Sequence, residues 1–173
     1  MDKTRSFISS RRKASWVRIP SLTPLMKKIL VMGLPGSGKT TLSTALSKIL
    51  NAVHFNADEI RSKINKDLTF DVADRIEHAR RMGVLCDIVN RTGVYAIADF
   101  VCPTAAAREA FGAKDAYVIL MARKPVRDFS DTTKLFTQPN EYHLKVDESH
   151  ELDYWVHYIY NNLKSIEHED YKI

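Results

Sequence analysis

One stretch of eight residues constrains the fold of this chain more than any other. Residues 33–40 read Gly-Leu-Pro-Gly-Ser-Gly-Lys-Thr and fit the pattern G-x-x-x-x-G-K-[ST] of a phosphate-binding loop. The apolar residues 29–32 precede the loop and predict a short buried strand. After the loop, residues 40–50 carry apolar side chains at helical spacing. Because the motif requires a strand before it and a helix after it, these flanks predict a P-loop rather than a chance glycine turn.

The residue types of this loop suit the binding of ATP. Its glycines permit backbone angles that a side chain would block, so that N–H groups can gather around a phosphate. The start of the following helix adds unpaired N–H donors. We expect Lys39 to bridge the outer phosphates and the Thr40 hydroxyl to ligate Mg²⁺. The residues predicted to bind ATP are Gly33, Pro35, Gly36, Ser37, Gly38, Lys39, Thr40 and Thr41.

The basic charge of the chain is concentrated at its N-terminus. The 173 residues carry a net charge of +5, but residues 1–28 hold eight Lys and Arg against one Asp and contribute +7. The remaining residues hold 18 basic and 20 acidic side chains and carry −2. A nearly neutral body argues against a nucleic-acid surface over the whole domain.

Residues 1–25 are rich in Ser, Arg and Lys and lack sustained periodicity, which predicts a disordered basic extension before a folded domain at residues 26–173. Three interpretations of the extension stay open. It is a basic arm that binds nucleic acid or an acidic surface, or an organelle transit peptide. In the third, the segment is dispensable or not native, because Met26 stands three residues before the first strand.

The sequence shows no feature of a membrane or secreted protein. No apolar run approaches the roughly 18 residues that span a bilayer, and no signal-peptide core is visible. Cys86 and Cys102 lack metal-ligand spacing and suit structural thiols in a reducing compartment. We therefore expect a cytoplasmic protein that contacts no membrane and builds no metal site from its own ligands alone.

Strands and helices are predicted to alternate along the rest of the chain. Further strands are expected at residues 53–55, 94–101, 116–121 and 142–146. Helices are expected at residues 60–64, from 74 to a stop at Gly93, at 103–111 and at 152–166, whereas 122–139 show little apolar pattern. This alternation predicts an α/β fold with a mostly parallel sheet of about five strands and a site at their carboxyl ends.

Several segments together resemble the adenylyl-sulfate (APS) kinase family. They are residues 33–42, Asn-Ala-Asp-Glu-Ile-Arg at 56–61, Ile-Asn-Lys-Asp-Leu-Thr-Phe at 64–70, Ala-Asp-Arg at 73–75 and Phe-Val-Cys-Pro at 100–103. The resemblance runs from about residue 28 to about residue 112. It implies a P-loop kinase fold, a three-layer sandwich, that transfers the γ-phosphate of ATP to the ribose 3′-hydroxyl of adenylyl sulfate in sulfate assimilation.

The chain departs from the family pattern at four places. The family usually has Asp-Gly-Asp at residues 56–58, where this chain has Asn-Ala-Asp, and an Asn at His78. Its Ile-Ser-Pro is Val-Cys-Pro at residues 101–103. Its lid segment is longer, and Arg123 and Arg127 are the lid candidates here.

Two carboxylates are candidates for the chemistry of phosphoryl transfer. Asp58 follows the second strand and is the predicted base for the acceptor hydroxyl, with capping of the short helix as its structural alternative. Asp99 ends an apolar strand and is predicted to hold Mg²⁺ through water, with hydrogen bonding to the P-loop as the alternative.

The acceptor is predicted to meet a second group of side chains. Arg61 and Arg75 are fork-shaped donors suited to an anion, and Phe70 either stacks on a base or packs in the core. His78 completes the predicted acceptor-binding residues. Arg80 and Arg81 are expected on a solvated helix face.

Three functions follow from these features. The first is APS kinase, with ATP and APS as substrates, Mg²⁺ as cofactor and a homodimer left open. The second is a kinase of the same fold that acts on a nucleoside, a modified DNA base or a polynucleotide end. The third is a non-catalytic, ATP-gated nucleic-acid binder that uses the basic tail.

Overall fold

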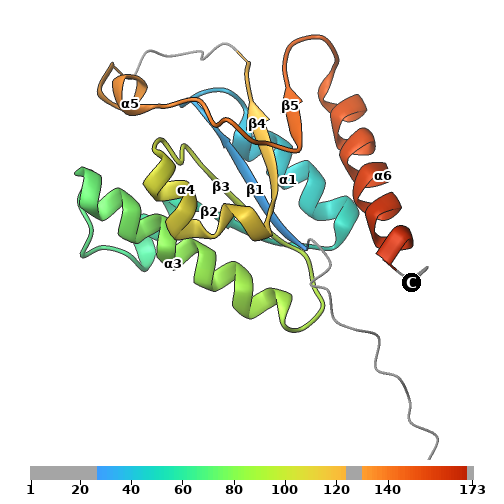
Figure 1. The fold of residues 1–173 in the computed structure, drawn as a ribbon, viewed down its shortest axis with the longest axis horizontal. Helices are drawn as coiled ribbons and strands as arrows, with labels where there is room; N and C mark the ends of the chain where they lie inside the picture. The colour runs from blue at the N-terminus through green and yellow to red at the C-terminus, as the bar shows by residue number, and fades with distance from the viewer. Residues whose placement is uncertain (1–26, 124–129, 171–173) are drawn as a thin grey trace, which may run out of the picture.

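The computed structural model describes residues 27–123 and 130–170 (Figure 1). The elements in chain order are β1 (Lys28–Gly33), α1 (Lys39–Leu50), β2 (Val53–Asn56), α2 (Ala57–Lys63), α3 (Val72–Asn90), β3 (Ala96–Phe100), α4 (Ala105–Phe111), the 3₁₀ helix η1 (Ala113–Asp115), β4 (Tyr117–Met121), α5 (Ser130–Leu135), β5 (Leu144–Val146) and α6 (Leu152–Asp170). The expected basic extension at residues 1–25 lies outside the described residues.

A sheet of five parallel strands forms the centre of the molecule, in the order β2-β3-β1-β4-β5. Val31 of β1 is in register with Asp99 of β3 on one side and with Ile119 of β4 on the other. Asn56, the last residue of β2, is in register with Asp99. Because the strands are parallel, their carboxyl ends meet at one edge, which brings Asn56, Asp99 and the loop after β1 together.

Helices cover both faces of this sheet and complete a three-layer sandwich (Figure 1). Successive side chains of β1 alternate between the faces, so Leu30 joins one apolar cluster and Val31 the other. α3 and α4 contribute to the first cluster, and α1 and α6 to the second. Burial on both faces explains the continuous apolar run in β1. The predicted α/β sandwich with five strands is confirmed.

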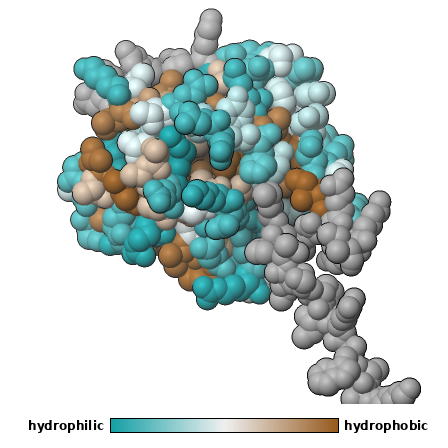
Figure 2. All heavy atoms as spheres, in the orientation of Figure 1, coloured by the Kyte–Doolittle hydropathy of each residue, from teal (hydrophilic) through white to brown (hydrophobic). Residues whose placement is uncertain are grey.

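α3 and α4 approach each other closely at a glycine. A Cβ atom built on Gly83 would lie 2.4 Å from the carbonyl oxygen of Phe111, so any larger residue would push the helices apart. The outer surface of this layer is mostly polar with scattered apolar side chains (Figure 2). Val84 and Ile88 of α3 are among the exposed apolar residues.

The structure differs from the sequence prediction at the starts of α2 and α3 and in the presence of α5. α2 and α3 begin at residues 57 and 72, earlier than the predicted 60 and 74, because Asn56 and Asp71 cap them with their side chains. α5 lies in the segment for which no helix was expected, since its sequence Ser-Asp-Thr-Thr-Lys-Leu is polar and lacks an apolar stripe.

The two cysteines and the hydropathy of the helices agree with what the sequence indicated. Cys86 and Cys102 are free and buried, and burial raises the pKa of both thiols, as expected for structural cysteines. Within residues 27–123 and 130–170, no helix combines the length and the hydropathy that crossing a bilayer requires.

Candidate active site

The loop between β1 and α1 adopts backbone conformations that glycine permits and other residues rarely take. Gly36 and Gly38 adopt positive φ angles of 75° and 89°. A Cβ atom on Gly33 would lie 2.5 Å from the carbonyl oxygen of Met121. The Ser37 hydroxyl is buried and has no hydrogen-bond partner among the described residues. An unpaired buried hydroxyl beside a helix start is the feature expected where a phosphate would bind.

Lys39 is the first residue of α1 and is only 9% exposed. Its Nζ donates to the carbonyl oxygen of Leu34 across the loop at 2.7 Å. Burial lowers the pKa of Lys39, while the negative charges of Asp99 and Asp58 raise it. The ammonium group therefore lies at the phosphate-binding loop, within electrostatic reach of two carboxylates.

Asp99 is the centre of a hydrogen-bonded group at the carboxyl edge of the sheet and is 2% exposed. Its Oδ2 accepts from Thr40 Oγ1 at 2.6 Å, and its Oδ1 lies 3.1 Å from Asn56 Nδ2 and 3.1 Å from His54 Nε2. The predicted hydrogen bond between Asp99 and the P-loop is confirmed. The sequence reading missed His54, although its place two residues before Asn56 puts both on one side of β2.

The Thr40 hydroxyl and the Asp99 carboxylate are hard oxygen ligands of the kind that Mg²⁺ takes. Among the residues that the structure describes, no group of three or more His, Cys, Asp and Glu side chains could hold a metal ion. The donor set therefore fits an ion that shares its coordination with the phosphates of a nucleotide.

Asp58 lies in the first turn of α2 and is exposed. The helix is capped by Asn56, whose Oδ1 accepts from Glu59 N at 3.0 Å, so the capping alternative for Asp58 was wrong. Burial lowers the pKa of both Lys39 and Arg61, with the positive charge of Arg75 adding to the shift of Arg61, and the negative charge of Asp58 opposes the shift in each. Its carboxylate is thus within electrostatic reach of the P-loop lysine and of a predicted acceptor arginine.

Two guanidinium groups flank an exposed aromatic ring. Phe70 is 64% exposed, and its ring centroid lies 4.7 Å from Arg61 Cζ and 5.5 Å from Arg75 Cζ. Arg61 Nη1 donates to Thr69 O at 2.6 Å, and Arg75 Nε donates to Phe70 O at 2.7 Å. Neither guanidinium forms a salt bridge with a described residue. Core packing of Phe70 is therefore wrong, and both cations are available to an anion.

His78 is a buried residue of α3 that contacts the loop after α2. It is 3% exposed and packs edge-on against Phe100 with the ring centroids 6.3 Å apart. Asn65 Nδ2 donates to His78 Nδ1 at 2.9 Å, an orientation fixed because Asn65 Oδ1 accepts from Arg81. His78 thus holds the loop after α2, which revises the expectation that it contacts the acceptor directly.

Arg81 does not lie on a merely solvated face. Its Nη2 donates to Asp67 at 2.7 Å and its Nε donates to Glu77 at 2.8 Å, so it ties the loop after α2 to α3. The expectation for Arg81 was wrong because its partner in the loop lies 14 residues away in sequence. Arg80 bonds only to Glu77 in the described contacts and is exposed, as predicted.

Of the two lid candidates, Arg123 is half-buried just after β4. Arg127 lies outside the described residues.

The buried state of His78 predicts a loss of stability in acid. Burial, with the positive charges of Arg61 and Arg81, lowers the pKa of His78 from 6.5 to about 4. Between these values the unfolded chain binds a proton that the folded chain does not, so stability is complete above pH 6.5 and falls towards pH 4. We expect His78→Gln to reduce the acid loss of unfolding free energy by about 1 to 3 kcal/mol.

Denaturant titrations at several pH values would measure this effect. His157→Gln is the matched control, since His157 is exposed on α6. A wild-type protein and a His78→Gln variant with the same pH slope would exclude the assignment.

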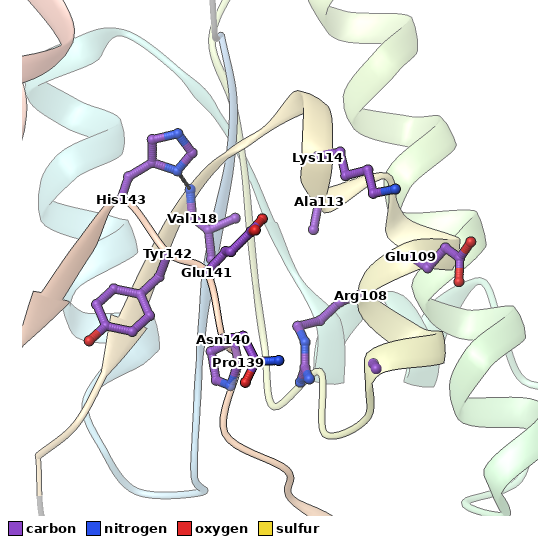
Figure 3. A pocket seen from close by; sticks show the side chains of 11 residues that line it. Arg108, Glu109, Ala113, Lys114, Val118, Pro139, Asn140, Glu141, Tyr142 and His143 are labelled. Atoms are coloured by element: carbon purple, nitrogen blue, oxygen red, sulfur yellow. Dashed lines mark hydrogen bonds between the residues drawn. The ribbon is translucent and has the colours of Figure 1, made fainter.

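A separate cavity of about 600 Å³ lies between α4, η1 and residues 139–143. Figure 3 shows Arg108 and Lys114 on one side of it and Tyr142 and His143 on the other. Arg108 already donates to Thr137 O at 3.0 Å, and His143 Nδ1 accepts from Val118 N at 3.1 Å. None of the predicted site residues lines this cavity.

Comparison with known proteins identifies the family. The family model described as adenylylsulphate kinase matches residues 26–138. The chain belongs to the adenylylsulphate kinase family. Among curated relatives of this family, adenylyl-sulfate kinase 3 of Arabidopsis thaliana is 36% identical over 87 residues, which are 47% of this chain and 42% of the relative. The adenylyl-sulfate kinase of Shewanella oneidensis is 32% identical over 107 residues, 59% of this chain and 51% of the relative.

The chain therefore spans about half the length of these curated adenylyl-sulfate kinases or less. Among solved structures, an APS kinase of Mycobacterium tuberculosis in complex with AMPPNP and APS has a TM-score of 0.64 and 17% identity. The match covers 79% of this chain and 98% of that one. At this identity the likeness shows the fold, and it agrees with the P-loop kinase sandwich predicted from the sequence.

Proposed function

We propose that this protein is an ATP-dependent kinase that transfers the γ-phosphate to the 3′-hydroxyl of adenylyl sulfate. The observation that carries the proposal is the position of Asp58. Asp58 lies two residues after Asn56, whose Nδ2 is 3.2 Å from Thr40 Oγ1 in the P-loop, and its charge acts on both Lys39 and Arg61. This placement supports Asp58 as the base for the acceptor hydroxyl.

At the donor end, the loop N–H groups and Lys39 would bind the phosphates of ATP and neutralise charge that develops during transfer. Thr40 and Asp99 would hold Mg²⁺, which when bound supplies further neutralisation of the phosphate charge. The buried hydroxyl of Ser37, without a partner among the described residues, supports a phosphate at this place.

At the acceptor end, Arg61 and Arg75 would bind the phosphate–sulfate anion of APS, and Phe70 would stack on the adenine. The Phe70 ring lies against both cations, and both guanidiniums donate to backbone carbonyls rather than to carboxylates. Asp58 would then accept the proton of the 3′-hydroxyl as the phosphoryl group arrives. Among residues 27–123 and 130–170, we find no such observation in favour of the second and third functions considered from the sequence.

An acceptor panel tests the proposal. ADP release would be followed with ATP and, in turn, APS, a nucleoside and a DNA end, and without any acceptor as the control. We expect APS to give the largest increase over the rate without acceptor. A larger increase with a nucleoside or a DNA end would limit the family likeness to the fold and the donor end. The homodimer and the cytoplasmic location remain predictions.

A shortened chain tests the proposed domain boundary. We expect a protein that begins at Met26 to keep the turnover of the full chain and to melt within about 5 °C of it, because residues 1–25 lack the apolar periodicity that joining a core requires. Turnover and melting temperature of both chains would be compared. A larger drop in melting temperature would mean that the segment packs, whereas a loss of DNA binding alone would favour a nucleic-acid role for it.

A further inference from the structure

The side chain of Asn56 joins three groups at the donor end of the site. Its Nδ2 lies 3.1 and 3.3 Å from the two carboxylate oxygens of Asp99 and 3.2 Å from Thr40 Oγ1. Its Oδ1 accepts from Glu59 N at 3.0 Å. The amide is therefore fixed from both sides, with its donor towards Asp99 and its acceptor towards α2.

The neighbours of Asp99 are donors, and the carboxylate is buried. Thr40 Oγ1 donates to one of its oxygens, and His54 Nε2 lies 3.1 Å from the other. No Lys or Arg forms a salt bridge with Asp99 among the described residues. A buried carboxylate needs hydrogen-bond donors to replace its hydration. Of the donors named here, the Asn56 amide contacts both Asp99 oxygens and the Thr40 hydroxyl.

Replacement of Asn56 by Asp, which has nearly the same shape, would turn the attraction between residue 56 and Asp99 into repulsion. Asp keeps an oxygen that can accept from Glu59 N, so the cap of α2 survives the exchange. The other oxygen, however, would replace Nδ2 at hydrogen-bond distance from a buried carboxylate, and the two negative charges would repel. A divalent cation between the two carboxylates would remove that repulsion.

We propose that Asn56 is a positioning residue whose amide takes the place of a cation beside Asp99. The amide holds Asp99 and Thr40 together before any metal binds. Mg²⁺ therefore adds little stability to the protein without nucleotide. The ion then enters with the nucleotide, because Mg²⁺ binds readily where phosphates share its coordination. This inference rests on the proposed function only in taking Asp99 and Thr40 as magnesium ligands.

Melting curves of the full-length chain without nucleotide test the proposal. They would be recorded in EDTA and in millimolar MgCl₂ for the wild type, for Asn56→Asp and for Asn161→Asp, which adds the same charge at an exposed position on α6. We expect the wild type and Asn161→Asp to respond to Mg²⁺ by less than about 1 °C. Asn56→Asp should melt about 5 °C lower or more in EDTA and recover at least half of this loss in MgCl₂.

Results of two kinds, one from the wild type and one from Asn56→Asp, would overturn the proposal. One is a wild type that Mg²⁺ alone stabilises by several degrees. The other is an Asn56→Asp variant that melts like the wild type in EDTA, or that is equally destabilised with and without Mg²⁺. Because these curves need neither ATP nor APS, they decide the role of Asn56 even if the protein proves to phosphorylate another acceptor.

A second variant guards against a failure of Asn56→Asp to fold. Asn56→Ala removes both the amide donor and the cap of α2 without adding charge, so it should melt lower than the wild type, and Mg²⁺ alone should restore less of its stability than that of Asn56→Asp. Its affinity for Mg·ATP, measured by calorimetric titration, should fall about tenfold, the effect of losing a hydrogen bond to a charged group. An unchanged affinity for Mg·ATP in Asn56→Ala would contradict a positioning role.

Discussion

Replacement of Lys39 by Ala is expected to lower the rate of phosphoryl transfer by a factor of about 10²–10³ while the protein stays folded. Lys39 begins α1 beside the phosphate-binding loop, and its ammonium group is nearly buried. In such a position we expect it to act on charge that develops during transfer, and loss of one preorganised donor to that charge costs about 3–4 kcal/mol. The expected effect is on kcat with ATP and APS.

Lys48→Ala is the matched control for this prediction. Lys48 lies in the last turn of the same helix and is exposed, so its loss should leave turnover unchanged. Melting temperatures of both variants would establish that they fold. A folded Lys39→Ala protein that keeps more than about a tenth of wild-type turnover would contradict the assignment of the donor site.

Replacement of Arg75 by Ala is expected to raise the KM for APS by about 10- to 150-fold and to leave the KM for ATP nearly unchanged. Arg75 lies beside the exposed ring of Phe70, is oriented by a hydrogen bond to Phe70 O, and has no salt bridge with a described residue. Loss of a charge-assisted contact to the acceptor anion costs roughly 1.5–3 kcal/mol, which gives the stated range.

Arg80→Ala separates this effect from a general change of charge on α3. Arg80 is on the same helix, is exposed and bonds to Glu77, which is also held by Arg81. Steady-state kinetics with each substrate varied in turn would give both KM values. If Arg75→Ala and Arg80→Ala raise the KM for APS equally, the effect comes from net charge and not from an anion site.

The parts of this structure that the sequence predicted are those set by short-range patterns. The P-loop follows from eight consecutive residues and their flanks, and the alternation of apolar strands and helices predicts the parallel sheet that places Asp99 beside it. Helix starts were less accurate, because a capping side chain such as Asn56 adds residues before the apolar pattern begins.

The parts that were missed depend on contacts between segments distant in sequence. The hydrogen bonds of Asp99 with Asn56 and His54 span more than 40 residues. The tie between Arg81 and Asp67 likewise requires α3 to pack beside the loop after α2. No local pattern distinguishes Arg81 from its exposed neighbour Arg80, so only the folded arrangement separates the two.

The most direct measurement is identification of the product formed from ATP and APS. The full chain would be incubated with both substrates and Mg²⁺, with Lys39→Ala as the inactive control. The products would be separated and identified by mass spectrometry. We expect ADP and adenylyl sulfate that carries one added phosphate on its 3′-hydroxyl. Unmodified APS after prolonged incubation with folded protein, or a phosphate at another position of APS, would contradict the proposed function.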